Sequence, residues 1–196
     1  MAAFDFDGTL TYHDTFLPWL WTLVGPLRFI AGMLRCLPWL LAYKLGLLAN
    51  DRAKVKVLKT LVRGRLLSEL TASGRAFADL IPARLRPDML ARLRWHQEKG
   101  HTCVLVSASL ELYLVDWALQ NGFAAVLATR LELDEDGRAT GQLAGANCYG
   151  VEKGRRLWAW LEHTRPAKLY AYGDTRGDRE MLHLADEAWY RGKPRA

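Results

Sequence analysis

Apolar residues recur along the chain with two different spacings, which divide the sequence into two regions. Between residues 15 and 94 they lie three and four positions apart, as in the stretches 52–67 and 70–81, and no run alternates apolar with polar positions. That spacing places apolar side chains along one face of an α-helix, so we expect the whole region to be helical.

From residue 95 onward, short apolar runs alternate with helical stretches, which is typical of strand–helix–strand units in a parallel sheet. Residues 129–143 alternate in polarity around Asp136-Gly137, a pair that favours a hairpin turn. The expected strands are residues 102–106, 124–128 and 168–172, and the expected helices are residues 110–120, 152–163 and 179–185.

The two regions predict an α/β fold with an all-helical insertion. Residues 1–4 are apolar, and we expect them to form a further buried strand of the parallel sheet. The core then comprises residues 1–14 and 95–196, and the helical cap comprises residues 15–94. A chain of 196 residues is long enough for one such core and an inserted subdomain.

The first part of the cap, residues 16–48, is rich in apolar and aromatic residues. Its tryptophans and basic residues are Trp19, Trp21, Trp39, Arg28, Arg35 and Lys44. Because the basic residues interrupt it, no uncharged run reaches the roughly 18 residues that cross a bilayer, and we expect short helices. Two arrangements are open: the tryptophans pack inside a small helical cap, or they lie with the arginines at a membrane surface.

The formal net charge of +6 favours anionic partners without choosing among phosphates, nucleic acid and acidic lipid. We expect no nucleic-acid partner, because the basic tail at residues 191–195 is short and expected to be solvated. Cys36, Cys103 and Cys148 lack the spacing of a metal site, which indicates reduced thiols in a cytoplasmic protein. No basic leader with a cleavage site opens the sequence, so we expect no removable signal peptide.

Two acidic residues, Asp5 and Asp7, stand at the end of the first expected strand and are followed by Gly8. Ligand sites of open α/β sheets lie beyond the carboxyl ends of the strands, so this position suits a functional site. Two carboxylates this close repel each other, and a hard divalent cation would relieve that repulsion. An ordinary acidic turn is the alternative interpretation.

A second acidic group, with Asp174 and Asp178, directly follows the expected strand at residues 168–172. If both strands belong to one parallel sheet, these acids converge on Asp5 and Asp7 at the same edge. Asp174 could also be no more than a helix cap, but that interpretation leaves the matching strand ends unexplained.

Ser107 and Lys153 complete a set of residues suited to phosphate. Ser107 follows the expected strand at residues 102–106, where its hydroxyl could donate to a phosphate oxygen or simply cap a helix. Lys153 begins the next helical segment, where a lysine is usually solvated. Each residue is weak evidence by itself, and their combination is stronger.

In order and spacing, these residues resemble the four motifs of the haloacid dehalogenase superfamily. The motifs are Asp5-x-Asp7-Gly-Thr-Leu-Thr, Ser107, Lys153 and Gly173-Asp174-x-x-x-Asp178. The resemblance implies a Rossmann-like core with a C1-type cap, as in subfamily IB, the phosphoserine-phosphatase-like branch. Residues 106–153 are similar to uncharacterised hydrolases of that branch, and the apolar cap is similar to that of phosphatidylglycerophosphatase C.

The resemblance also implies a phosphatase mechanism. Asp5 would be the nucleophile that forms an aspartyl-phosphate, and Asp7 would protonate the leaving alcohol and later activate water. Ser107 and Lys153 would bind the transferring phosphoryl group.

Mg²⁺ is the implied cofactor. It would be held by the Asp5 carboxylate, the backbone carbonyl of Asp7 and Asp174, with Asp178 orienting this group.

The implied substrate is a small phosphorylated molecule; a lipid phosphate, as for a phosphatidylglycerophosphatase, and phosphoserine are the alternatives. Asp14 stands where phosphoserine phosphatases have a Glu, and Ala108 lies in the serine motif, so both are expected substrate contacts. Arg52 and Arg63 are candidates for binding a substrate carboxylate. The protein would be cytoplasmic, with peripheral contact of the cap with the inner membrane as a further alternative.

Two other classes of protein are less consistent with the sequence. A phosphoacceptor receiver also gathers acids, a hydroxyl and a lysine at its sheet edge, but it has no use for a cap after the first strand. A catalytically idle membrane-surface protein would not need both acidic pairs at the strand ends.

Overall fold

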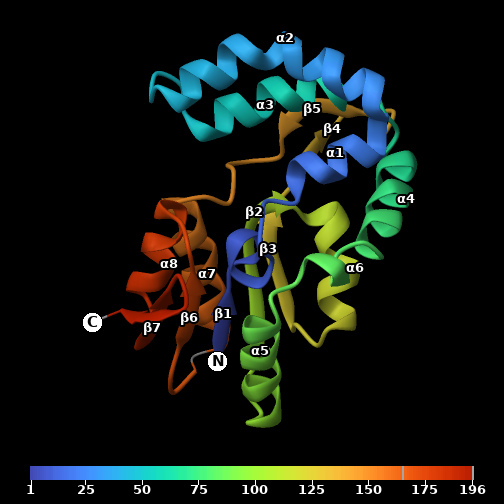
Figure 1. The fold of residues 1–196 in the computed structure, drawn as a ribbon. Coiled ribbons are helices and arrows are strands. Elements are labelled where there is room, and N and C mark those ends of the chain that lie inside the picture. The colour runs from blue at the N-terminus through green and yellow to red at the C-terminus, as the bar shows by residue number, and fades with distance from the viewer. Residues whose placement is uncertain (165, 196) are drawn as a thin grey trace.

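The computed structural model describes residues 1–164 and 166–195. Within these residues, six strands form one sheet in the order β3-β2-β1-β6-β7-β8 (Figure 1). Neighbouring strands are parallel except for β7 and β8, which are antiparallel. The strands are β1 (Ala2–Phe4), β2 (Cys103–Leu110), β3 (Ala125–Thr129), β6 (Tyr170–Gly173), β7 (Glu187–Tyr190) and β8 (Lys193–Arg195).

Helices cover both faces of the sheet, as an all-apolar central strand requires. Successive side chains of a strand point to opposite faces, so Phe4 joins a buried cluster with Leu93 and Tyr113, whereas Ala3 joins another with Leu157. One face is covered by α5 (Pro87–Glu98) and α6 (Glu111–Gln120), and the other by α7 (Val151–Thr164) and α8 (Arg179–His183). The predicted α/β fold is confirmed.

The cap follows the first strand and lies beyond the carboxyl edge of the sheet (Figure 1). Its helices are α1 (Phe16–Val24), α2 (Pro26–Lys44), α3 (Asn50–Leu61) and α4 (Leu67–Ala78), followed by the short turn η2 (Pro82–Arg84). Among the described residues, no helix is both long enough and apolar enough to span a bilayer.

Helix and strand bounds differ from the predictions where apolar periodicity gives no stop signal. Helices α3 and α4 end earlier than the stretches 52–67 and 70–81 suggested. The basic tail is not wholly free, because residues 193–195 pair with β7 although their side chains are exposed. Helix α5 begins at a proline and spans the boundary expected after residue 94, so we propose that the cap ends near residue 86.

A hairpin of the second half of the chain packs against the cap. Its strands are β4 (Leu131–Leu133) and β5 (Ala139–Leu143), with the predicted turn between them. A Cβ at Gly141 would collide with Lys59 of α3, and the Gly64 amide donates to the Ala139 carbonyl at 2.8 Å. The hairpin is therefore part of the joint between cap and core.

The three tryptophans of the cap do not share one environment. One packs in the interior, and two are partly exposed, so each of the two arrangements expected from the sequence is seen for part of the set. Trp19 is fully buried and stacks on Tyr113 with ring centroids 5.4 Å apart, so it packs the cap onto the core. Trp21 and Trp39 are 43% and 38% exposed. The three cysteines are buried free thiols.

Candidate active site

Three adjacent strands deliver the predicted residues to one edge of the sheet. Asp5 follows β1, Asp174 follows β6, and Ser107 lies in β2, so the order β2-β1-β6 brings them together. The chain then turns sharply at Gly8, which has φ of +80°. A side chain there would collide with the Asp174 carboxylate, so glycine is needed for this approach.

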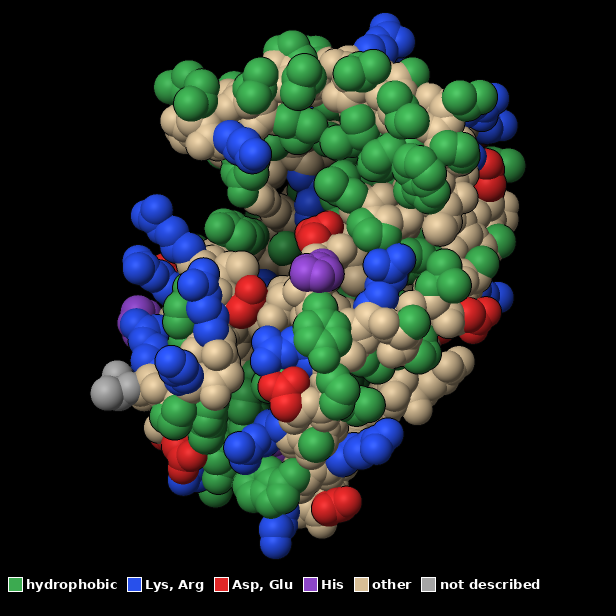
Figure 2. All heavy atoms as spheres, in the orientation of Figure 1, with side chains coloured by type: hydrophobic (Ala, Val, Ile, Leu, Met, Phe, Trp, Pro, Cys, Tyr) green, Lys and Arg blue, Asp and Glu red, His purple; other side chains and the backbone are tan. Residues whose placement is uncertain are grey.

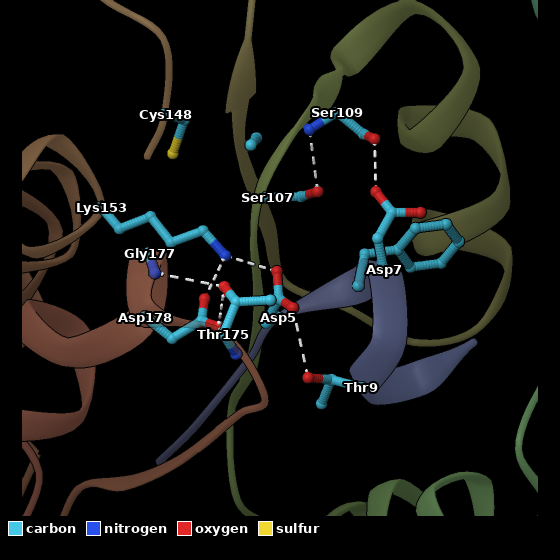
Figure 3. A network of polar contacts seen from close by, with 12 residues as sticks. Asp5, Asp7, Thr9, Ser107, Ser109, Cys148, Lys153, Thr175, Gly177 and Asp178 are labelled. Carbon is cyan, nitrogen blue, oxygen red and sulfur yellow. Dashed lines mark hydrogen bonds and ion pairs between the residues drawn. The ribbon is translucent and has the colours of Figure 1, made fainter. Parts of the chain in front are cut away.

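Lys153 lies at the centre of the site. It comes from the first turn of α7, and its Nζ bonds the Asp5 carboxylate and Asp178 Oδ1, the latter at 2.6 Å (Figure 3). The lysine is only 2% exposed. Burial disfavours its charge, but Asp5 and Asp178 outweigh burial and raise its pKa. Lys153 is therefore an ammonium ion inside the protein.

Asp178 positions its neighbours through its second oxygen. Oδ2 accepts from the amides of Asp174 and Thr175, at 3.2 and 2.8 Å, and from the Thr175 hydroxyl at 2.9 Å. Burial alone would raise the pKa of Asp178, but Lys153 and these donors lower it. The carboxylate stays charged and holds the loop that carries Asp174.

Oxygen atoms of Asp5, Asp174 and Asp178 lie within 4.8 Å of one another. Burial raises the pKa of Asp5 and of Asp174, and the charge of Asp178 raises both further. Three carboxylates against one ammonium leave two negative charges, which a divalent cation would offset. All three are hard oxygen ligands, so these residues fit Mg²⁺.

Thr9 contacts two of these acids. Its hydroxyl lies 3.2 Å from Asp5 Oδ2 and 3.2 Å from Asp174 Oδ1 and can donate to either. Thr9 stands within the first motif, but nothing in the sequence pattern distinguished it from its neighbours.

The Asp7 side chain points away from the acidic cluster. Its Oδ1 accepts from the Thr15 amide and hydroxyl, at 2.8 and 2.6 Å, and its Oδ2 accepts from the Ser109 hydroxyl (Figure 3). Burial and, to a smaller extent, the charge of Asp14 raise the pKa of Asp7 to about 6, although these hydrogen bonds act to lower it. The Asp7 carboxyl is therefore outside the metal cluster, and a ligand role for its carbonyl stays a prediction.

Ser107 is buried, and its Oγ accepts from the Ser109 amide at 3.0 Å, which leaves its own proton for another acceptor.

Ala108 and Asp14 both line a cavity between cap and core, and Asp14 also accepts from the Phe16 amide at 3.0 Å. Arg52 is exposed outside this cavity, so the structure does not support it as a contact for substrate. The same holds for Arg63.

The cavity holds a cation that the sequence did not indicate. Lys54 of α3 donates to the Ala108 carbonyl and to Asn147 Oδ1, the latter at 3.2 Å. Burial lowers its pKa to about 8, against the opposing charges of Asp14 and Asp7. The cavity measures about 340 Å³, and Asp5, Asp7 and Lys153 line it together with Lys54.

Comparison with known protein families shows to which family the chain belongs. The model of the haloacid dehalogenase-like hydrolases matches residues 2–183. The chain belongs to this family. The resemblance inferred from the motifs is thus confirmed, and the chain is a haloacid dehalogenase-like hydrolase.

The chain is similar to one set of known proteins in sequence and to another in fold. Protein CicA of Caulobacter vibrioides is 40% identical over 202 residues, which are 99% of this chain and 88% of CicA. A protein of unknown function from Bordetella pertussis has a TM-score of 0.79 at 24% identity, over 96% of this chain and 87% of that one. A substrate-bound phosphoserine phosphatase has a TM-score of 0.69 at 16% identity, over 96% and 84%. These structural likenesses show a common fold.

Proposed function

We propose that this hydrolase is a Mg²⁺-dependent phosphatase that cleaves a phosphomonoester through an aspartyl-phosphate on Asp5. The observation that carries the proposal is the buried Asp5, held by Lys153 beside two further carboxylates at the end of a cavity. A buried carboxylate nucleophile next to a fixed cation suits attack on an anionic phosphate.

In the first step an Asp5 oxygen attacks phosphorus and forms the acyl-phosphate bond while the bond from phosphorus to the alcohol oxygen breaks. Asp7, whose pKa is raised to about 6, donates its proton to the leaving oxygen. Bound Mg²⁺, held by Asp5 and Asp174, would offset the repulsion between nucleophile and phosphate.

In the second step the deprotonated Asp7 takes a proton from water, which attacks phosphorus, releases inorganic phosphate and restores the Asp5 carboxylate. Lys153 stabilises the phosphoryl charge with a proton not used on Asp5 and Asp178, and Ser107 donates its free hydroxyl. Ser109 and Thr15 hold Asp7 in place between the two steps.

The cavity favours a substrate with an apolar part next to the phosphate. Its walls include Phe16, Leu17, Leu40 and Val57, which supports a lipid phosphate head group as a second candidate beside small phosphomonoesters. Phosphoserine is less well supported, because among the described residues no arginine lines the cavity. Lys54 is the cap cation placed to meet a substrate beyond its phosphate.

The test is phosphate release from a generic phosphomonoester by the purified chain with Mg²⁺. Activity should be lost with a chelator and on Asp5→Asn, which removes the nucleophilic carboxylate but keeps its shape. Asp136→Asn, the same change in the exposed hairpin turn, is the matched control and should leave activity unchanged. Full activity of Asp5→Asn would refute the mechanism, and a screen of small and lipid phosphates distinguishes the two substrate classes.

A further inference from the structure

Helix α2 carries an apolar stripe on its outer face. The stripe consists of Leu27, Ile30, Leu34, Leu37 and Leu41. Steps of three and four residues place these side chains on one line along the helix, and they are between 47% and 83% exposed. Surface leucines are common singly, but a continuous line over the length of a helix is unusual for a free protein surface.

The opposite face of α2 is already used. Gly32 lies so close to α3 that a Cβ there would collide with Leu61. The sulfur of the buried Cys36 lies 3.3 Å from the Thr60 hydroxyl oxygen. The packing of α2 on α3 therefore turns the stripe outward, where no part of the described chain covers it.

The charged residues that α1 and α2 place around the stripe are all basic. Residues 15–49 contain no Asp or Glu, whereas Arg28, Arg35 and Lys44 of α2 are exposed. The exposed Trp21 adds an amphipathic ring. Figure 2 shows hydrophobic side chains gathered across the cap, with basic side chains toward its edges.

We propose that this face of α2 docks on the surface of an anionic lipid bilayer, with the helix lying in the interface. Leucines and tryptophan suit the boundary between acyl chains and head groups, and the arginines suit the acidic head groups. A second copy of the chain fits less well, because a symmetric contact would bring the same basic, acid-free face onto itself.

Helix α2 also contributes to the wall of the cavity. Leu40 and Tyr43 of α2 and Leu17 of α1 line the cavity, and Leu17 and Tyr43 are also partly exposed. Helix α2 thus carries apolar side chains both on the outward stripe and, on its other sides, at the cavity. This docking does not depend on the proposed phosphatase activity.

The experiment is co-sedimentation of the full chain with vesicles of phosphatidylcholine alone or of phosphatidylcholine mixed with phosphatidylglycerol. We expect binding to the mixed vesicles and a loss of binding at high salt, which screens the arginines. Arg28→Ala and Arg35→Ala should each weaken partitioning about fivefold. Leu34→Asp should reduce it more strongly, because it places a negative charge within the stripe.

The matched control is Leu119→Asp, which changes a similarly exposed leucine on α6, away from the cap. It should bind vesicles as the parent does, and a far-UV circular dichroism spectrum and urea unfolding curve of Leu34→Asp like those of the parent show that the variant is folded. Equal binding by both variants, or no preference for anionic vesicles, overturns the proposal. A concentration-dependent dimer that Leu34→Asp dissociates would instead assign the face to a second copy.

Discussion

Asp7 is the residue whose protonation state the proposed chemistry depends on most. We predict that Asp7→Asn slows alcohol release from an alkyl phosphate by roughly 100- to 10,000-fold, the usual contribution of general acid–base catalysis. The loss should be far smaller for p-nitrophenyl phosphate, whose leaving group departs without a proton. The measurement is the burst of alcohol or phenol release in a single turnover, and equal losses for both esters would contradict the assignment.

The lowered pKa of Lys54 predicts that kcat/KM depends on pH. Its pKa is lowered to about 8, so the cavity holds a positive charge below that pH and loses it as the pH rises through 8. Ionisation of the general acid Asp7 should already lower kcat/KM from about pH 6. Loss of the Lys54 charge should add a second fall above pH 8, because substrate then meets a neutral amine.

A matched pair of variants tests this effect. Lys54→Arg keeps its charge throughout and should abolish the second fall, whereas Lys56→Arg, on the exposed side of the same helix, should retain it. A second fall that persists unchanged in Lys54→Arg would exclude Lys54 as its source.

The sequence identifies those site residues that follow a strand or begin a helix in a recognisable order. Asp5, Asp174 and Asp178 could be predicted because parallel strands carry their carboxyl ends to one edge. Lys54 could not be predicted in this way, because its place in the site depends on how the cap packs on the core. Arg52, two positions away, points outward for the same reason that Lys54 points inward, the helical rotation of about 100° per residue.

At the scale of elements, the turn after β1 gives a prediction on stability. Gly8→Ala should lower the free energy of unfolding by more than the roughly 1–2 kcal/mol that an alanine pays in the left-handed region, because its Cβ also collides with Asp174. Gly46→Ala is the control, since Gly46 has φ of +74° and open space around it. Urea unfolding of both variants measures the difference, and equal losses would show that the collision is relieved without cost.

Most elements could be predicted from periodicity, and the exceptions have a physical reason. The strand at residues 124–128 and the helix at residues 152–163 match β3 and α7 within one residue at each end. Strand β7, which lies between β6 and β8, was missed because its residues Glu187–Tyr190 are all only partly buried and show neither an uninterrupted apolar run nor alternation. Contacts between elements, such as the β4–β5 hairpin on α3, leave no signal in either pattern.

At the scale of the whole molecule, the site concentrates negative charge in a chain that is positive overall. The folded state brings Asp5, Asp174 and Asp178 together, whereas unfolding separates them. A divalent cation should therefore bind the folded chain more tightly than the unfolded chain. We predict that Mg²⁺ raises Tm, with a gain of about 2.7 kcal/mol at a concentration one hundred times its Kd.

Asp174→Asn separates this effect from catalysis. Because burial and Asp178 raise the pKa of Asp174, its ionised form is unfavourable in the folded state without metal, so the neutral amide should raise Tm in a chelator. The same substitution removes a ligand and should abolish most of the Mg²⁺ shift, whereas Asp136→Asn should preserve both values. A variant that is less stable in chelator yet keeps the full shift would mean that Asp174 stabilises the loop and leaves the cation to other groups.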